Sequence, residues 1–348
     1  MIRSLFFLLA ALFSTLHAEL SDLRLPTDNQ HLFTGELDLF YMYVDRVFEG
    51  ETKKPWEGGS FGYVRSPIRV NGEVVMSQFH EGIDIAPMKR DKAGNPLDLV
   101  MAISKGTVVY CSLIAGRSNY GKYVVVEHDW EGSKVYSLYA HLAEITVTPG
   151  DPVKSGSVLG RMGYTGAGLN RARAHVHLEL GFLMSPHYES WHKQNFGSAN
   201  YHANFNGINI AGIDVASFFL EHSKNPDLKF SEFILSRPIQ FIVTIPAGEK
   251  DPEFLLRHTW MKREGPADAA SWEIGFSATG HVIYFQPSSR FVSAPVLSHV
   301  RPSENNIPQR WLTRGLLTGE GNQVSLSRNG KQMLSLLLDN FPRETESF

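Results

Sequence analysis

Apolar and polar residues alternate in short runs through the first half of the chain, and glycine, asparagine and proline separate the runs. The turn-forming sequence Asn-Tyr-Gly-Lys at 119–122, for example, leads into the β-branched run at 123–128. Period-two alternation predicts strands, and glycine-containing breaks between such runs predict hairpin turns. We therefore expect residues 58 to about 181 to form an antiparallel β domain.

The sharpest alternation lies at 175–180, where the sequence reads His-Val-His-Leu-Glu-Leu. Side chains two residues apart on a strand share a face. A strand here would place His175, His177 and Glu179 on one face and the apolar residues on the other. Both imidazoles would then point the same way.

A second chemically rich segment lies almost a hundred residues earlier, at 78–86, with the sequence Gln-Phe-His-Glu-Gly-Ile-Asp-Ile-Ala. Its glycine and β-branched isoleucines favour an extended chain. That conformation would place His80, Gly82 and Asp84 on a common face. Together the two segments predict three histidines and a carboxylate at one divalent-metal site.

A third segment, 136–142, adds a further histidine, because the same alternation would place Ser137, Tyr139 and His141 on one face. Zinc in hydrolytic sites takes imidazole and carboxylate ligands, with three protein groups and one position open to water. Four histidines and one aspartate exceed three ligand positions. The surplus indicates that some of these residues act as general acid or base.

The order of these segments resembles the lysostaphin and LytM-type zinc endopeptidases, which cut peptide bonds in bacterial cell-wall peptidoglycan. The similarity runs from about residue 58 to 180. Its six blocks lie at 60–67, 79–86, 106–109, 139–142, 160–166 and 175–180. The first block includes Phe-Gly-Tyr-Val-Arg, similar to the opening Phe-Gly-Tyr-Arg segment of the family.

The resemblance implies a role for each candidate residue. His80, Asp84 and His177 would bind Zn²⁺ as the metal ligands. His141 and His175 would be the catalytic residues, which flank the attacking water, activate it and stabilise the oxyanion.

Nearby residues carry further hypotheses. Glu179 would orient a ligand histidine, or would serve as an ordinary strand-edge or salt-bridge group. The loop at 167–174 is longer than is usual in the family and is expected to bring Arg171 and Arg173 near the metal. There they would hold a carboxylate of an acidic stem peptide, or stay solvated. The segment 88–98 is a second insertion expected to shape specificity.

The N-terminus has the pattern of a secretory signal peptide: a basic start, an apolar centre and a small residue at Ala18. The apolar centre is shorter than the roughly 20 residues of a membrane span, so we expect cleavage, no membrane anchor afterwards, and a periplasmic or extracellular location. The formal charge of −3 argues against nucleic acid as a partner. The single cysteine, Cys111, excludes an internal disulfide.

The expected fold class is mainly β: an antiparallel β-sheet catalytic domain of the lysostaphin/LytM type, a short helical segment, and a separate α+β C-terminal domain. Asp214 is the expected N-cap of the helix. Apolar runs predict C-terminal strands at 241–245, 272–276, 282–285 and 323–327, and a helix at 331–338. The expected domains are 1–18, the signal peptide; 19–57, an extension packing on the catalytic domain; 58–235, the metallopeptidase domain with a loop and helix extension after 181; and 236–348, an accessory domain.

The sequence thus predicts an exported zinc metalloendopeptidase, a monomer, that hydrolyses peptidoglycan peptides at stem-peptide cross-links or interpeptide bridges through a metal-activated water. One alternative is a protein of the same fold that regulates cell-wall amidases without catalysis. Another is a zinc endopeptidase that acts on Gly-rich exported proteins.

Overall fold

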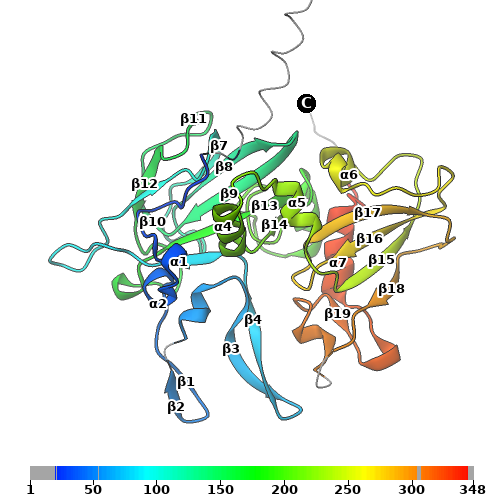
Figure 1. Ribbon diagram of the computed structural model, residues 1–348, viewed down its shortest axis with the longest axis horizontal. Helices are drawn as coiled ribbons and strands as arrows, with labels where there is room; N and C mark the ends of the chain where they lie inside the picture. Colours follow the sequence, from blue (N-terminus) through cyan, green and yellow to red (C-terminus); the bar gives the residue numbers. More distant parts are fainter. Residues whose placement is uncertain (1–19, 21, 54, 304–306, 344–348) are drawn as a thin grey trace, which may run out of the picture.

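The structure is a computed structural model that describes residues 20, 22–53, 55–303 and 307–343; the expected signal peptide lies outside these residues. Two β-rich units lie side by side, one from the first half of the chain and one from the C-terminal third (Figure 1). The sheets are antiparallel and the helices few, which confirms the mainly β fold class. In the described part of the chain, no helix has both the length and the apolar character needed to span a membrane.

The largest sheet has seven strands, all paired antiparallel, and six of them follow the order β11-β7-β8-β9-β13-β14. The seventh strand, β5, pairs with the first half of β13 along the edge opposite to β9. The strands are β5 (Ile83–Ile85), β7 (Gly106–Ser112), β8 (Tyr123–Trp130), β9 (Ser133–Ala140), β11 (Pro152–Val153), β13 (Val176–Leu183) and β14 (Ile210–Gly212). All eight residues of β13 are buried, so this strand is the centre of the unit.

Leu178, Leu180 and Phe182 of β13 belong to the main apolar core, on the face predicted by the alternation of 175–180. The opposite face carries His177 and Glu179. Antiparallel pairing sets Asp84 of β5 directly against His177, so the two side chains project from the same face.

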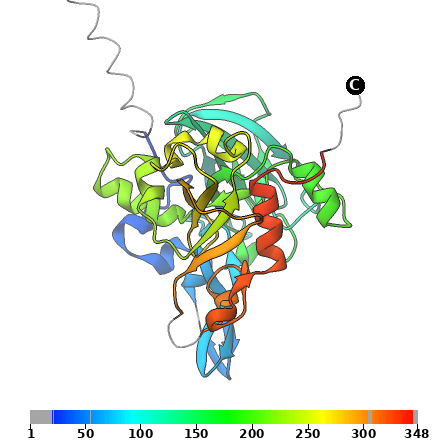
Figure 2. The same ribbon diagram turned by 90° about the vertical axis from the view of Figure 1, so that its right-hand side faces the viewer.

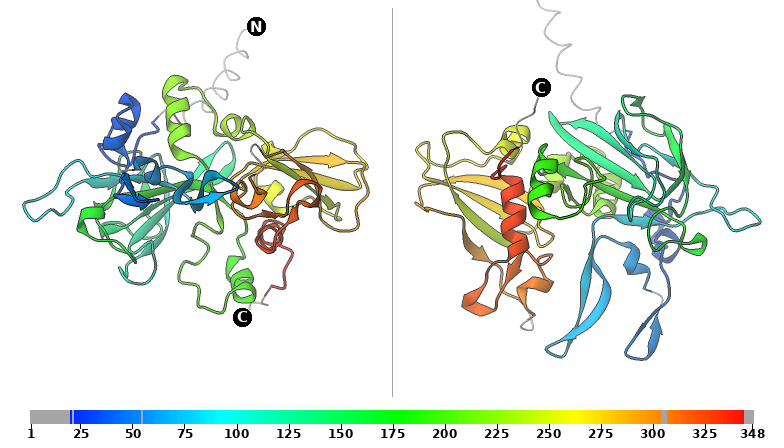
Figure 3. Two further views of the ribbon diagram at one scale, coloured as in Figure 1. Left: turned by 90° about the horizontal axis from the view of Figure 1, so that it is seen from below. Right: turned by 180° about the vertical axis from the view of Figure 1, so that it is seen from behind.

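Smaller sheets and helices surround this unit. They are the three-stranded sheet β10 (Leu142–Ile145), β12 (Val158–Met162) and β6 (Leu99–Met101), the hairpin β3 (Gly62–Val70) and β4 (Glu73–His80), the hairpin β1 (Arg46–Phe48) and β2 (Glu51–Lys53), the helices α1 (His31–Thr34) and α2 (Leu37–Phe40), and the 3₁₀ turns η1 (Trp56–Gly59) and η2 (Arg171–Arg173). The two hairpins project from the same side of the body (Figure 3). The N-terminal segment runs along β5, where the amide of Met42 donates to the carbonyl of Asp84 at 2.8 Å.

Helices α3 (Tyr188–Asn195), α4 (Val215–Lys224) and α5 (Phe230–Leu235) follow β13. The prediction for α4 is confirmed: Asp214 is the N-cap, and its side chain accepts a hydrogen bond from the amide of Ser217. Phe218 and Phe219 bury one side of this helix in the core.

The C-terminal unit has its own four-stranded antiparallel sheet in the order β17-β16-β15-β18, with helix α7 beside its strands (Figure 2). Its elements are β15 (Phe241–Pro246), α6 (Glu253–Arg257), η3 (Thr259–Met261), β16 (Ser271–Phe276), β17 (Val282–Ser288), β18 (Val296–Val300), η5 (Gln309–Trp311), β19 (Leu317–Thr318), η6 (Gly321–Gln323), β20 (Ser325–Leu326) and α7 (Arg328–Leu337). Three predicted strands and the helix are confirmed. The strand expected at 323–327 is reduced to the two residues of β20, and β18 is an addition.

The two units share one continuous apolar core. Phe182 of β13 is fully buried, and its ring centroid lies 4.4 Å from that of His258 and 5.7 Å from that of His281. Arg257 donates to the carbonyls of Leu183 and Met184 at 2.8 Å each. The C-terminal unit therefore covers the end of β13, the strand that carries the candidate metal ligand His177.

Candidate metal centre

His80 and Asp84 reach the centre from two different strands. His80 is the last residue of β4 and Asp84 is the middle residue of β5, and the chain bends between them. The expectation of one extended segment through 78–86 is therefore wrong. A Cβ on Gly82 would lie 2.3 Å from the carbonyl oxygen of Leu178, so the bend requires glycine to approach β13 this closely.

Three candidate ligand atoms converge where these strands meet β13. Nε2 of His80 lies 3.0 Å from Nδ1 of His177 and 3.1 Å from Oδ1 of Asp84. Nδ1 of His177 lies 3.0 Å from the same Oδ1. Among the described residues, these three form the one group of histidine, cysteine and carboxylate side chains close enough to share a metal ion. All three are buried.

The outer nitrogens of both histidines contact groups that only accept hydrogen bonds. Nδ1 of His80 lies 2.7 Å from the carbonyl oxygen of Ser60, and Nε2 of His177 lies 2.9 Å from Oε1 of Glu179. Each outer nitrogen must therefore carry a proton, which leaves a lone pair on each inner nitrogen when the rings are neutral. Two lone pairs and the Asp84 carboxylate then face one another at about 3 Å. A cation relieves this repulsion, so the donor set fits a divalent metal such as zinc.

Two further histidines lie beside the ligand group. Nε2 of His175 is 3.3 Å from Oδ1 of Asp84, and the His141 ring centroid is 4.6 Å from that of His175. Nδ1 of each ring contacts a backbone carbonyl, that of Thr165 for His141 and that of Arg173 for His175. Nε2 is therefore the basic atom of both rings.

His141 reaches the centre in a way that alternation did not predict. Strand β9 ends at Ala140, and His141 has a left-handed backbone with φ of 65°. Tyr139 instead belongs to the apolar core, where its hydroxyl accepts a hydrogen bond from the amide of Ile103. The expected common face for Ser137, Tyr139 and His141 is therefore wrong, because the turn after β9 carries His141 to the opposite side.

Electrostatics distinguish the residues of the centre. Burial, together with the neighbouring His175 and His177, holds the pKa of His141 well below its usual value, so its ring is neutral at pH 7. Burial also opposes ionisation of Asp84, but the surrounding histidines outweigh it and hold the pKa of Asp84 well below 3.8. For His177, hydrogen bonds to Asp84 and Glu179 outweigh burial and raise the pKa to about 9. The centre thus favours positive charge between the ligand atoms.

Several residues that complete the centre were not predicted from the sequence. Arg65 of β3 donates to Oδ2 of Asp84 at 2.5 Å, which fixes the orientation of that carboxylate. Tyr120 donates to Oε1 of Glu179 at 2.6 Å. From the C-terminal unit, Arg314 pairs with Glu81, the neighbour of His80, at 3.0 Å. Arg65 belongs to the first similarity block, but no spacing rule connects these three residues with the ligands.

A cavity of about 270 Å³ opens onto the centre and is lined by all three candidate ligand residues, His141 and His175. Arg173 also lines it, whereas Arg171 does not. Arg171 instead donates to the carbonyl of Ala93 in the 88–98 insertion at 2.6 Å. Of the two loop arginines expected near the metal, the structure brings only Arg173 there.

Comparisons with known proteins identify a family that part of this chain resembles. Residues 78–186 match the family described as Peptidase family M23. The Lipoprotein NlpD/LppB homolog of Pseudomonas aeruginosa is 35% identical over 134 residues, which is 38% of this chain and 38% of that protein. The uncharacterized protein NMB1333 of Neisseria meningitidis is 36% identical over 118 residues, 33% of this chain and 16% of that protein. The matches thus span well under half the length of these curated relatives.

Among solved structures, the catalytic domain of lysostaphin from Staphylococcus simulans matches at 22% identity. The match covers 51% of this chain and 92% of that domain, with a TM-score of 0.29. A zinc-containing peptidase from Vibrio cholerae matches at 24% identity over 41% of this chain and 36% of that protein, with a TM-score of 0.25.

Proposed function

We propose that this chain is a zinc metalloendopeptidase that hydrolyses peptide bonds in bacterial peptidoglycan, because its residues 78–186 match peptidase family M23. The observation that carries the proposal is the convergence of His80, Asp84 and His177 in a cavity that is also lined by two further histidines, His141 and His175. Three ligands and two spare bases are the components of metal-assisted amide hydrolysis.

The ligand residues would hold the metal through Nε2 of His80, Nδ1 of His177 and the carboxylate of Asp84. When bound there, zinc supplies a Lewis acid that lowers the pKa of water to about 7 and polarises a carbonyl. Glu179 holds the His177 ring through its outer nitrogen, and Arg65 holds the carboxylate of Asp84. These contacts set the orientation of the ligand atoms before a metal arrives.

His141 and His175 supply the proton chemistry. The lowered pKa of His141 keeps its Nε2 free to accept the proton that the attacking water loses. The same nitrogen then returns the proton to the amine that leaves. Nε2 of His175, once protonated, would donate to the oxygen of the peptide carbonyl as negative charge develops on it. Which bond of peptidoglycan is cut depends on the loops around the cavity.

We propose an exported protein, in the periplasm or outside the cell, because peptidoglycan lies there. The signal-peptide pattern at 1–18 supports this location, as does the similarity to a relative named as a lipoprotein. Peptidoglycan peptides are the proposed partner of a monomeric enzyme. A protein that only regulates cell-wall amidases would not need histidines at the two catalytic positions. Here both His141 and His175 line the cavity, which favours an enzyme.

The test is mass spectrometry of the soluble products released from purified peptidoglycan by the zinc-loaded protein, with and without a chelator. We expect peptide products that disappear with the chelator and return with added zinc. The matched control is His141→Ala, which retains all three ligands and should release almost none. A folded, zinc-loaded wild-type protein that releases no peptides would overturn the proposed activity.

A further inference from the structure

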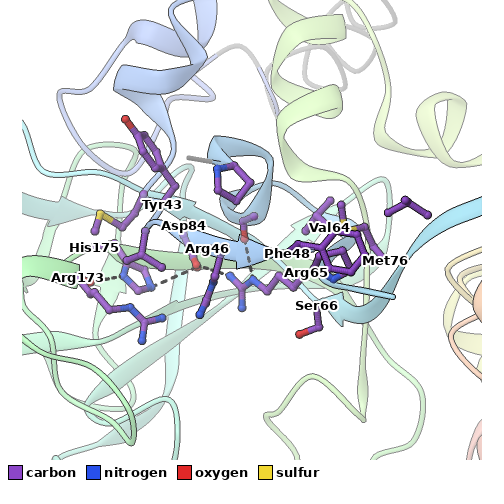
Figure 4. Close-up of a pocket in the computed structure, with 16 residues that line it drawn as sticks. Tyr43, Arg46, Phe48, Val64, Arg65, Ser66, Met76, Asp84, Arg173 and His175 are labelled. Carbon is purple, nitrogen blue, oxygen red and sulfur yellow. Dashed lines mark hydrogen bonds and ion pairs between the residues drawn. The ribbon is translucent and has the colours of Figure 1, made fainter. Parts of the chain in front are cut away.

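A second cavity, of about 160 Å³, lies next to the metal centre between the hairpins β1–β2 and β3–β4 (Figure 4). Asp84 and His175 are among its lining residues, so a ligand in this cavity would contact the centre. Much of its wall is apolar, including Phe48, Val64 and Met76. It therefore suits an aliphatic group held close to the reacting bond.

Three arginines, Arg46 of β1, Arg65 of β3 and Arg173 of η2, line this cavity around Asp84 and His175 (Figure 4). Burial and the positive charges of Arg46 and Arg65 all lower the pKa of Arg173. The three guanidinium groups are thus close enough to repel one another.

The carboxylates nearby do not balance these charges. Arg65 is paired with Asp84. Arg173 donates only to a backbone carbonyl, that of Gly168 at 2.8 Å. Arg46 is exposed, and no described carboxylate pairs with it. Two guanidinium groups therefore face the cavity without an acidic partner, which favours an anionic ligand over a neutral one.

We propose that Arg46 and Arg173 form a subsite for a carboxylate of the peptide substrate, with the apolar wall receiving the aliphatic part that carries it. This inference rests on the proposed peptidase function and specifies its substrate class as peptides with a free carboxylate near the scissile bond. Planar guanidinium groups match carboxylate oxygens in a bidentate geometry, so the subsite would also orient the peptide.

The two arginines of the subsite lie in parts of the chain that do not carry the candidate metal ligands. Arg46 lies outside the segment 78–186 that matches the peptidase family, in the N-terminal extension. Arg173 lies in the loop 167–174, where it is held against Gly168. The N-terminal extension and this loop would therefore set substrate preference, while His141 and His175 supply the chemistry.

The test uses two fluorescein-labelled synthetic stem peptides that differ only in having free carboxylates or carboxamides. Binding is measured by fluorescence anisotropy on the zinc-loaded His141→Ala protein, so the readout needs no turnover. We expect the free-carboxylate peptide to bind more tightly than the carboxamide. In that background, Arg46→Gln and Arg173→Gln should each weaken binding of the free-carboxylate peptide about tenfold, which corresponds to about 1.4 kcal/mol, and leave binding of the carboxamide peptide unchanged.

Arg171→Gln is the matched control, because Arg171 lies in the same loop but bonds to Ala93 outside the cavity. It should bind both peptides as the parent does. Equal binding of both peptides by the zinc-loaded His141→Ala protein would overturn the subsite. Arg46→Gln and Arg173→Gln variants that weaken binding of both peptides equally would also overturn it. Circular dichroism checks folding, and the exposure of Arg46 makes that variant structurally mild. Because binding is scored without hydrolysis, an inactive wild type would overturn the peptidase proposal while this comparison still decides the subsite.

Discussion

Glu179 fixes the outer nitrogen of His177, since its Oε1 lies 2.9 Å from Nε2 of the ring. The same carboxylate oxygen accepts from Tyr120, and Glu179 is fully buried. A buried carboxylate in this position orients the ring and makes its inner nitrogen a stronger ligand. His177 and Glu179, two positions apart on β13, would thus serve as a metal ligand and the group that orients it.

Glu179→Gln should therefore weaken zinc binding about 10- to 100-fold without unfolding the protein, because the amide keeps the shape but loses the charge. Competition with a chromogenic chelator measures the affinity. Glu127→Gln is the matched control: Glu127 accepts from the hydroxyl of Tyr136 in the same sheet, away from the centre. Equal zinc affinity in the Glu179 variant and the wild type would refute the supporting role.

The core shared by the two units predicts a large stability effect at Phe182. Its ring packs against Phe230 of α5, Phe254 of α6 and His281, the residue before β17. Phe182→Ala should lower the free energy of unfolding by about 3–5 kcal/mol, the usual cost of a buried phenylalanine. Urea denaturation measures it. Phe291→Ala, at a residue that is 80% exposed, should change it by less than about 0.5 kcal/mol. A similarly small change at Phe182 would contradict a shared core.

Buried histidines at the same interface predict acid sensitivity. Burial, with the nearby charges of Arg257 and His281, lowers the pKa of His258 from 6.5 to about 3. Burial lowers the pKa of His281 to about 4, although the carbonyl of Ala211 opposes this. Both rings stay neutral in the folded protein, whereas in the unfolded chain they take up a proton below pH 6.5. The folded state is therefore most stable, with respect to these two residues, above pH 6.5 and loses stability as the pH falls toward 4.

At pH 5 each of these histidines should lower the free energy of unfolding by about 2 kcal/mol relative to pH 7.5. Urea denaturation at both values measures the difference. The double variant His258→Leu and His281→Leu should lose much of it, whereas His299→Leu, at an exposed position, should retain it. An unchanged pH dependence in the double variant would exclude these two residues as its source.

Local patterning predicted the parts of the centre that depend on regular strands. His177 and Glu179 lie on one face of β13, and the apolar residues between them enter the core, because alternation is a property of the strand itself. The helix cap at Asp214 is local in the same way.

Patterning failed where the chain leaves regular structure. The bend at Gly82 brings the chain against the carbonyl of Leu178 on a distant strand, which no local rule contains. The left-handed backbone of His141 breaks the period-two alternation of β9. The contact between Arg314 and Glu81 joins residues 233 positions apart, so only the packed fold reveals it. Similarly, the sequence offers no reason to distinguish Arg171 from Arg173, which lie in the same loop. Only the structure shows that Arg171 donates to the carbonyl of Ala93 and Arg173 to that of Gly168.

The central claim is that His177 holds the metal whereas His141 performs proton transfer. The most direct measurement is the zinc content of purified His177→Ala and His141→Ala, determined together with peptide release from peptidoglycan. We predict that His177→Ala loses zinc and activity together, and that His141→Ala retains about one zinc per chain while losing most of its turnover. Undiminished zinc in folded His177→Ala, or full activity in His141→Ala, would contradict the account.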